Sequence, residues 1–101
     1  MKNRDLFEQL IQENVLENFQ KNRYGRYALL SAHIHAMEAC KIISRADVLN
    51  NMSDFTRLLT QILGEEISYK KFHHQYHNQT RHQFDMIDEY IATYDEIISN
   101  H

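Results

Sequence analysis

Residues 27–49, YALLSAHIHAMEACKIISRADVL, decide the fold of this 101-residue chain. Apolar side chains occupy most of the helical wheel in this stretch, and alanines at positions 28, 32, 36 and 39 keep the surface of such a helix narrow. A helix that is apolar on most of its circumference is usually buried and contacted from several sides. The sequence therefore predicts a central helix over residues 27–49, with other helices around it.

One amphipathic helix is predicted before this stretch and one after it. The first covers residues 3–22 and ends before Gly25, because glycine tolerates the left-handed conformation found after helix C-termini. It carries an apolar side chain at every fourth position: Phe7, Ile11, Val15 and Phe19. The second is a short helix over residues 54–63, for which Ser53 is the expected N-cap.

A long C-terminal helix is predicted over residues 69–99. Its apolar stripe advances by three or four residues at every step: Tyr69, Phe72, Tyr76, Thr80, Phe84, Ile87, Ile91, Tyr94 and Ile98. At 1.5 Å per residue, a helix of this length extends for about 45 Å, which is longer than the other helices. We expect part of it to overhang the bundle, and an overhang with apolar positions indicates a dimer interface or a partner groove.

Composition agrees with an all-α fold. Hydrophobic residues make up 43% of the chain, proline is absent and glycine occurs twice, so the turn residues that an all-β fold needs are scarce. We expect one helical domain over residues 1–101, with a four-helix bundle-like architecture. The predicted helices cover residues 3–22, 27–49, 54–63 and 69–99.

Several classes of protein are excluded or disfavoured by simple counts. The single cysteine, Cys40, rules out an internal disulfide and does not suggest an oxidising compartment. No apolar run approaches the roughly 20 residues of a membrane span, and the first residues do not read as a signal peptide. We therefore expect a cytoplasmic protein with no membrane partner. The formal charge of −3 argues against a generally basic nucleic-acid binder.

Charge is segregated along the predicted C-terminal helix. Residues 69–82 contain Lys70, Lys71, Arg81 and four histidines without an acid, whereas residues 85–96 contain five acids without a base. This order opposes the helix macrodipole, which favours acids first and bases last, so helix stability does not account for it. Three interpretations stay open: binding of a partner, self-association in which the two halves pair, and a solvated face without a role.

Partner binding is the interpretation that we favour. We expect a non-enzymatic interaction or regulatory protein, such as an inhibitor, immunity factor or adaptor of the kind that phages and mobile elements encode. Its long C-terminal helix would bind a macromolecule, with a protein as the first candidate and a nucleic acid or a second copy of the chain as the others. The predicted partner-binding residues are Tyr69, Lys70, Lys71, Phe72, His73, Tyr76, His77 and Arg81. The aromatic residues would anchor the contact, and the cations would set orientation and association rate.

The histidines of this segment predict a pH dependence. Lysine and arginine neighbours should lower the pKa values of His73, His74, His77 and His82, whereas an anionic partner should favour their protonated forms. We therefore expect partner binding to tighten as the pH falls from about 7.5 to about 6.

A nucleic-acid regulator is the main alternative. Residues 58–76 fit a helix-turn-helix in which the basic residues start the recognition helix, although the turn is about two residues longer than the compact form. Arg23 and Arg26 are candidate phosphate contacts beside two tyrosines. The simpler interpretation of these arginines is a cationic end of the first helix.

Enzymatic and metal-binding alternatives have weaker support. Arg26 and His33 are separated by six residues, the outer limit of the Arg-x4–6-His pattern of the HEPN ribonucleases, but Tyr27 stands where a polar residue often follows the arginine. His33 is otherwise expected to be a hydrogen-bonded core histidine, and Cys40 an inert thiol in an apolar helix. His73 and His77 could share a zinc ion only with further ligands. We expect no catalytic residues, no metal and no cofactor.

Overall fold

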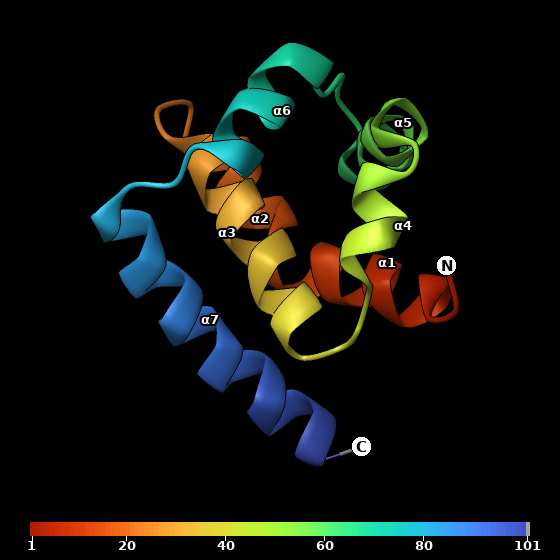
Figure 1. Ribbon diagram of the computed structural model, residues 1–101, viewed down its shortest axis with the longest axis vertical. Helices are drawn as coiled ribbons and strands as arrows, with labels where there is room; N and C mark the ends of the chain where they lie inside the picture. The colour runs from red at the N-terminus through yellow and green to blue at the C-terminus, as the bar shows by residue number, and fades with distance from the viewer. Residues whose placement is uncertain (101) are drawn as a thin grey trace.

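The computed structural model describes residues 1–100, which form seven helices and no strand (Figure 1). The helices are α1 (Arg4–Asn14), α2 (Leu16–Lys21), α3 (Arg26–Ala39), α4 (Arg45–Leu49), α5 (Met52–Leu63), α6 (Tyr69–His77) and α7 (Arg81–Ser99). The all-α class and a bundle-like arrangement are therefore confirmed, although the number of helices is larger than expected. No helix in this part of the chain has the length and apolar character needed to cross a membrane.

Helix α3 is the central element, as its sequence predicts. It contacts α2, α6 and α7, and Figure 1 shows α7 along one side of it and α6 across one end. Leu30, Ile34 and Met37 on this helix have no exposed surface. Burial of apolar side chains on several faces of one helix is the main contribution to a core of this kind.

The expected helix over residues 3–22 is interrupted at Val15. The backbone of Val15 has φ −119° and ψ −41°, outside the regular helical range, and this residue separates α1 from α2. The predicted stripe is nevertheless confirmed, because Phe7, Ile11, Val15 and Phe19 all have 0% exposure. Valine is a weak helix former, and its side chain is fully buried at the bend.

The expected helix over residues 27–49 also divides, into α3 and α4. At the end of α3, Lys41 adopts a left-handed conformation with φ 61°, and the amide of Ile42 donates to the carbonyl oxygen of Met37 at 3.0 Å. This is the hydrogen bond of a Schellman motif, which terminates a helix. Ser44 and Asp47 then form a capping box that starts α4.

The boundaries of α5 lie close to the prediction. The helix starts two residues earlier than expected, because the side chain of Asn51 rather than that of Ser53 accepts from the amide of Asp54. It ends at Gly64, which has φ 73° as a left-handed C-terminal residue should.

The single helix expected over residues 69–99 is wrong. Residues 78–80 separate α6 from α7, because Thr80 and Gln83 form a capping box that starts a new helix. The longest dimension of the molecule is 34 Å, which is too short for the expected overhanging rod. The hypothesis that one continuous C-terminal helix, cationic in its first half and acidic in its second half, binds the partner is therefore wrong in its first assumption, because the helix is not continuous. Most of the cationic segment instead lies on α6, whereas Arg81, His82 and the acidic segment lie on α7.

Candidate binding surface on helix α6

Helix α6 is fixed to the protein by its aromatic residues. Ser68 caps its start by accepting a hydrogen bond from the amide of Lys71 at 3.2 Å. Phe72 and Tyr76 have 0% and 2% exposure and belong to the core. The expectation that these two rings contact a partner is therefore corrected, since they hold α6 from beneath and are not accessible.

The opposite side of α6 carries only basic and aromatic functional groups. We call Lys70, Lys71, His73, His74 and His77 the cationic face of α6, and all five are exposed. Tyr69 adds a ring that is 47% exposed at the start of the same helix. Within residues 1–100, neither lysine forms an ion pair. The structure thus brings five of the predicted binding residues together: Tyr69, Lys70, Lys71, His73 and His77.

Arg81, the remaining predicted binding residue, lies across the loop from α6. It is the first residue of α7, it is exposed, and it forms no ion pair within residues 1–100. It can extend the cationic surface toward α7 but does not share the face of α6.

The rings of this face lie close to one another. The ring centroids of Tyr69 and His73 are 5.7 Å apart, and those of His73 and His77 are 4.5 Å apart. Desolvation lowers the pKa of His77, and the charges of His73, Arg45 and His35 lower it further. The expected repulsion between like charges therefore acts on His77, but desolvation is the larger cause.

A polar network lies beneath the C-terminal end of α6. The carboxylate of Glu38 accepts a hydrogen bond from the Tyr76 hydroxyl at 2.5 Å and lies 3.2 Å from Nδ1 of His35. Nε2 of His35 donates to the carbonyl oxygen of Tyr76 at 2.9 Å, since a carbonyl can only accept. Burial and the Glu38 carboxylate raise the pKa of Tyr76. The network joins α3 to α6 and limits movement of α6 on the core.

A second basic and aromatic segment lies next to the start of α6. Residues 22–25 connect α2 to α3, and within them the ring of Tyr24 is 97% exposed. The neighbouring residue Arg23 is exposed and forms no ion pair within residues 1–100. Arg26, the other candidate phosphate contact, is half-buried and pairs with Glu65 at 2.6 Å. Only Arg23 of the two predicted phosphate contacts is therefore free to bind.

The acids of the C-terminal segment form a separate surface. Asp85, Asp88, Glu89, Asp95 and Glu96 are all exposed on α7. On the other side of α7, Ile87 and Tyr94 are buried against the protein, and α7 packs almost entirely on α3. The charge segregation of the sequence therefore becomes two differently charged helices joined by a short loop.

The residue pair of the ribonuclease alternative is engaged inside the protein. His33 is 5% exposed, its Nδ1 lies 2.8 Å from the hydroxyl of Tyr94, and its ring stacks on Tyr90 with centroids 3.8 Å apart. Burial lowers the pKa of His33 to about 4. The interpretation of His33 as a hydrogen-bonded core histidine is confirmed, and Arg26 is held by Glu65.

Cys40 is also poorly suited to nucleophilic chemistry. Burial raises the pKa of its thiol to about 11, with further contributions from Asp95. The thiol donates a hydrogen bond to the carbonyl oxygen of Ile91 at 3.6 Å. A thiol with so high a pKa is almost entirely protonated near neutral pH and is a weak nucleophile.

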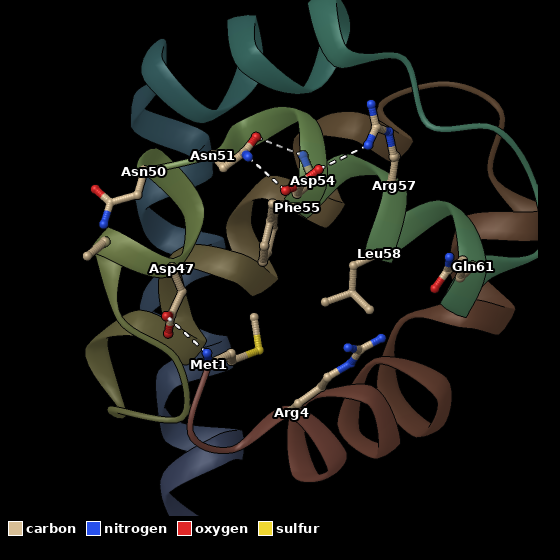
Figure 2. Close-up of a pocket in the computed structure, with 11 residues that line it drawn as sticks. Met1, Arg4, Asp47, Asn50, Asn51, Asp54, Phe55, Arg57, Leu58 and Gln61 are labelled. Carbon is tan, nitrogen blue, oxygen red and sulfur yellow. Dashed lines mark hydrogen bonds and ion pairs between the residues drawn. The ribbon is translucent and has the colours of Figure 1, made fainter.

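A hollow of about 600 Å³ lies elsewhere, between the start of α1, α4 and α5. Figure 2 shows Asp54 bonded to Asn51 and Arg57, and Asp47 paired with the amino group of Met1, whereas Arg4 points into the hollow without a bonded partner among the residues drawn. None of the predicted binding residues lines it. In the described part of the chain, no three or more His, Cys, Asp or Glu side chains gather as metal ligands would.

Comparisons with protein-family models, with curated proteins and with solved structures find no match for this chain.

Proposed function

We propose that this protein is a non-enzymatic binding protein that uses the cationic face of α6 to bind an acidic surface of a macromolecular partner. The observation that carries the proposal is the pair of exposed lysines, Lys70 and Lys71, without a counter-charge in the described structure. An inhibitor, immunity factor or adaptor would act in this way, by covering part of another molecule.

The rigidity of α6 supports this proposal. Phe72 and Tyr76 fix the helix from beneath, and the Glu38 network fixes its C-terminal end. A preorganised surface loses less conformational entropy on binding, so more of the interaction energy appears as affinity. The cationic face is therefore better suited to binding than a flexible basic segment of equal charge.

The two side chains considered for an enzymatic role, His33 and Cys40, are poorly placed for catalysis. His33 is buried with a lowered pKa, and Cys40 carries a raised pKa. General acid–base and nucleophilic catalysis need groups that reach the substrate and change protonation near the working pH. Neither side chain meets this requirement.

Two observations bear on the class of partner. The whole-chain charge of −3 repels any anionic partner at long range, and it repels a highly charged polyphosphate more than a moderately acidic protein. The arrangement of α5 and α6 favours a nucleic acid, because residues 64–68 join a 12-residue helix to a 9-residue helix whose outer face is basic. A helix-turn-helix uses helices of this size, whereas a single helix over residues 69–99 would be unusually long for a recognition helix.

The proposal is tested with poly-L-glutamate as an acidic partner of simple composition. Fluorescence anisotropy of labelled polymer should show binding to the wild-type protein that weakens as salt rises. The Lys70→Ala/Lys71→Ala double variant should bind about tenfold more weakly, equivalent to ~0.7 kcal/mol for each lysine. Binding should also tighten as the pH falls from about 7.5 to about 6, because an anionic partner favours the protonated form of His77, whose pKa is lowered in the free protein.

The matched control removes two cations elsewhere. Lys2→Ala/Arg4→Ala changes the net charge by the same amount at the exposed start of α1, which Figure 1 places away from α6. This variant should bind poly-L-glutamate like the wild type. Equal losses in both double variants, or no binding by the wild type at low salt, would contradict the proposal.

A further inference from the structure

We infer that the macromolecule bound by this surface is a single-stranded nucleic acid, held by a composite site that joins residues 22–25 to the start of α6. The inference rests on the proposed function, because it names the class of partner for the cationic face of α6. It adds Arg23 and Tyr24, which lie more than 40 positions earlier in the chain than Lys70 and Lys71.

Three contacts hold the two segments together. Arg26 pairs with Glu65 at 2.6 Å, just before α6. The amide of Ser68, the N-cap of α6, donates to the hydroxyl of Tyr27 at 2.9 Å. Because Arg26 and Tyr27 directly follow residues 22–25, these bonds place the exposed loop at the start of α6.

The third contact brings a lysine of α6 to the same place. Nζ of Lys71 lies 5.8 Å from the ring centroid of Tyr27, within the range of a cation–π interaction. Tyr24 is three residues from Tyr27, so their Cα atoms are at most about 11 Å apart. The exposed Tyr24 ring and the lysines of α6 can therefore contact neighbouring nucleotides of one strand.

The exposure of Tyr24 points to stacking. Its ring is 97% exposed and pairs with no other aromatic ring within residues 1–100. Tyr69 contributes a second exposed ring next to Lys70. Proteins that bind single strands combine such rings, on which bases stack, with lysines and arginines that follow the phosphates. Bases of a duplex are already stacked on one another, so a single strand uses these rings better.

Two of the three acids near this site are paired with cations. Glu65 is neutralised by Arg26, and Glu17 pairs with Lys21. Glu66 is exposed beside α5 and forms no ion pair within residues 1–100, so it is the one unpaired carboxylate among the three. Arg23, Lys70 and Lys71 therefore remain as the cations without an ion pair, which suits an anionic strand.

The test uses tryptophan as a reporter of stacking, since the chain contains none. Tyr24→Trp places the single fluorophore in the proposed site, and an oligothymidylate of about 15 nucleotides should quench it on binding. Ile98→Trp is the matched control, because Ile98 is also exposed but lies in the last turn of α7. Its fluorescence should not change.

Affinity measurements separate stacking from charge. Tyr24→Ala should weaken oligothymidylate binding by about 5- to 100-fold, whereas Tyr24→Phe, which keeps the ring, should bind nearly as the wild type does. Lys70→Ala/Lys71→Ala should reduce the slope of log affinity against log salt by about 1.4, at about 0.7 for each phosphate contact with a single strand.

The outcomes distinguish this inference from the proposed function. Loss of affinity in Tyr24→Ala for oligothymidylate but not for poly-L-glutamate supports the inference. If poly-L-glutamate binds while Tyr24→Ala and the wild type bind oligothymidylate equally, the inference is overturned and the acidic protein partner stands. Tighter binding to duplex than to single strand overturns it in favour of a helix-turn-helix. If neither polyanion binds, both proposals fail.

Discussion

Replacement of His33 by glutamine tests directly whether burial of this side chain links the stability of the core to pH. The ring of His33 is buried between α3 and α7, and burial lowers its pKa from 6.5 to about 4. The folded protein therefore binds this proton more weakly than the unfolded chain does. The stability linked to His33 is fully present above pH 6.5 and is lost progressively as the pH falls to about 4.

The magnitude follows from the two pKa values. A decrease from 6.5 to about 4 corresponds to about 3 kcal/mol of unfolding free energy, at about 1.4 kcal/mol for each tenfold change in proton affinity. Glutamine has no titration in this range and can still form a hydrogen bond with the Tyr94 hydroxyl. Between pH 7 and pH 4, the free energy of unfolding of the His33→Gln variant should therefore decrease by about 3 kcal/mol less than that of the wild type.

The measurement is urea unfolding followed by circular dichroism at several pH values. Carboxylates with lowered pKa values, such as Glu17 and Asp47, destabilise both proteins in acid, so only the difference between the two curves reports on His33. Parallel curves from pH 7 to pH 4 would refute the reasoning, because they would mean that His33 titrates alike in the folded and unfolded states.

Substitutions at four further positions test the helix boundaries and the orientation of α6. Thr80→Ala removes the side-chain cap of α7 and should cost about 1 kcal/mol, with Thr80→Ser close to the wild type in thermal unfolding. Lys41→Gly removes the strain of a side chain in the left-handed conformation at the end of α3. The free energy of unfolding, measured with urea, should therefore rise by about 0.5–1 kcal/mol. Phe72→Ala should destabilise by about 3–5 kcal/mol, whereas Tyr69→Ala should change the unfolding free energy by less than about 0.5 kcal/mol. Similar losses for the two aromatic residues would show that α6 is rotated relative to this description.

Burial in α1, α2 and α3 could be predicted from the sequence, whereas Tyr69, Phe84 and Ile98 of the predicted C-terminal stripe are exposed. The spacing of Phe7, Ile11, Val15 and Phe19 indicates one buried stripe, and all four are buried although a bend interrupts their helix. The spacing of apolar residues indicates which side chains are buried, and these side chains stay buried when the helix bends. The central position of α3 follows from the same reasoning.

The helix breaks could not be read from periodicity. Tyr76, Thr80 and Phe84 keep a spacing of four residues across the loop at residues 78–80, so the spacing alone joins α6 to α7 although Thr80 is polar. The signal that separates them is the Thr80-x-x-Gln83 capping box, a local hydrogen-bond motif that a count of apolar spacing does not register. The break after α3 has no glycine to mark it, since Lys41 takes the left-handed position.

The candidate site was predictable only within α6. The basic character of residues 69–82 is a local property of the chain, and the structure places most of it on one exposed face. The contact between Tyr27 and Ser68 joins positions separated by 41 residues, and no short-range pattern encodes it. The same holds for Glu38 and Tyr76, whose pairing depends on how α3 and α6 cross.

The attachment of α7 to a single neighbour has a consequence for behaviour in acid. Because α7 rests almost entirely on α3, it can detach as a unit while the other six helices stay folded. Detachment uncovers the His33 ring, and a proton bound there hinders the return of the helix. At mildly acidic pH we therefore expect amide hydrogen exchange in α7 to accelerate first, with the inner side of the released helix, Ile87 and Tyr94, open to other surfaces.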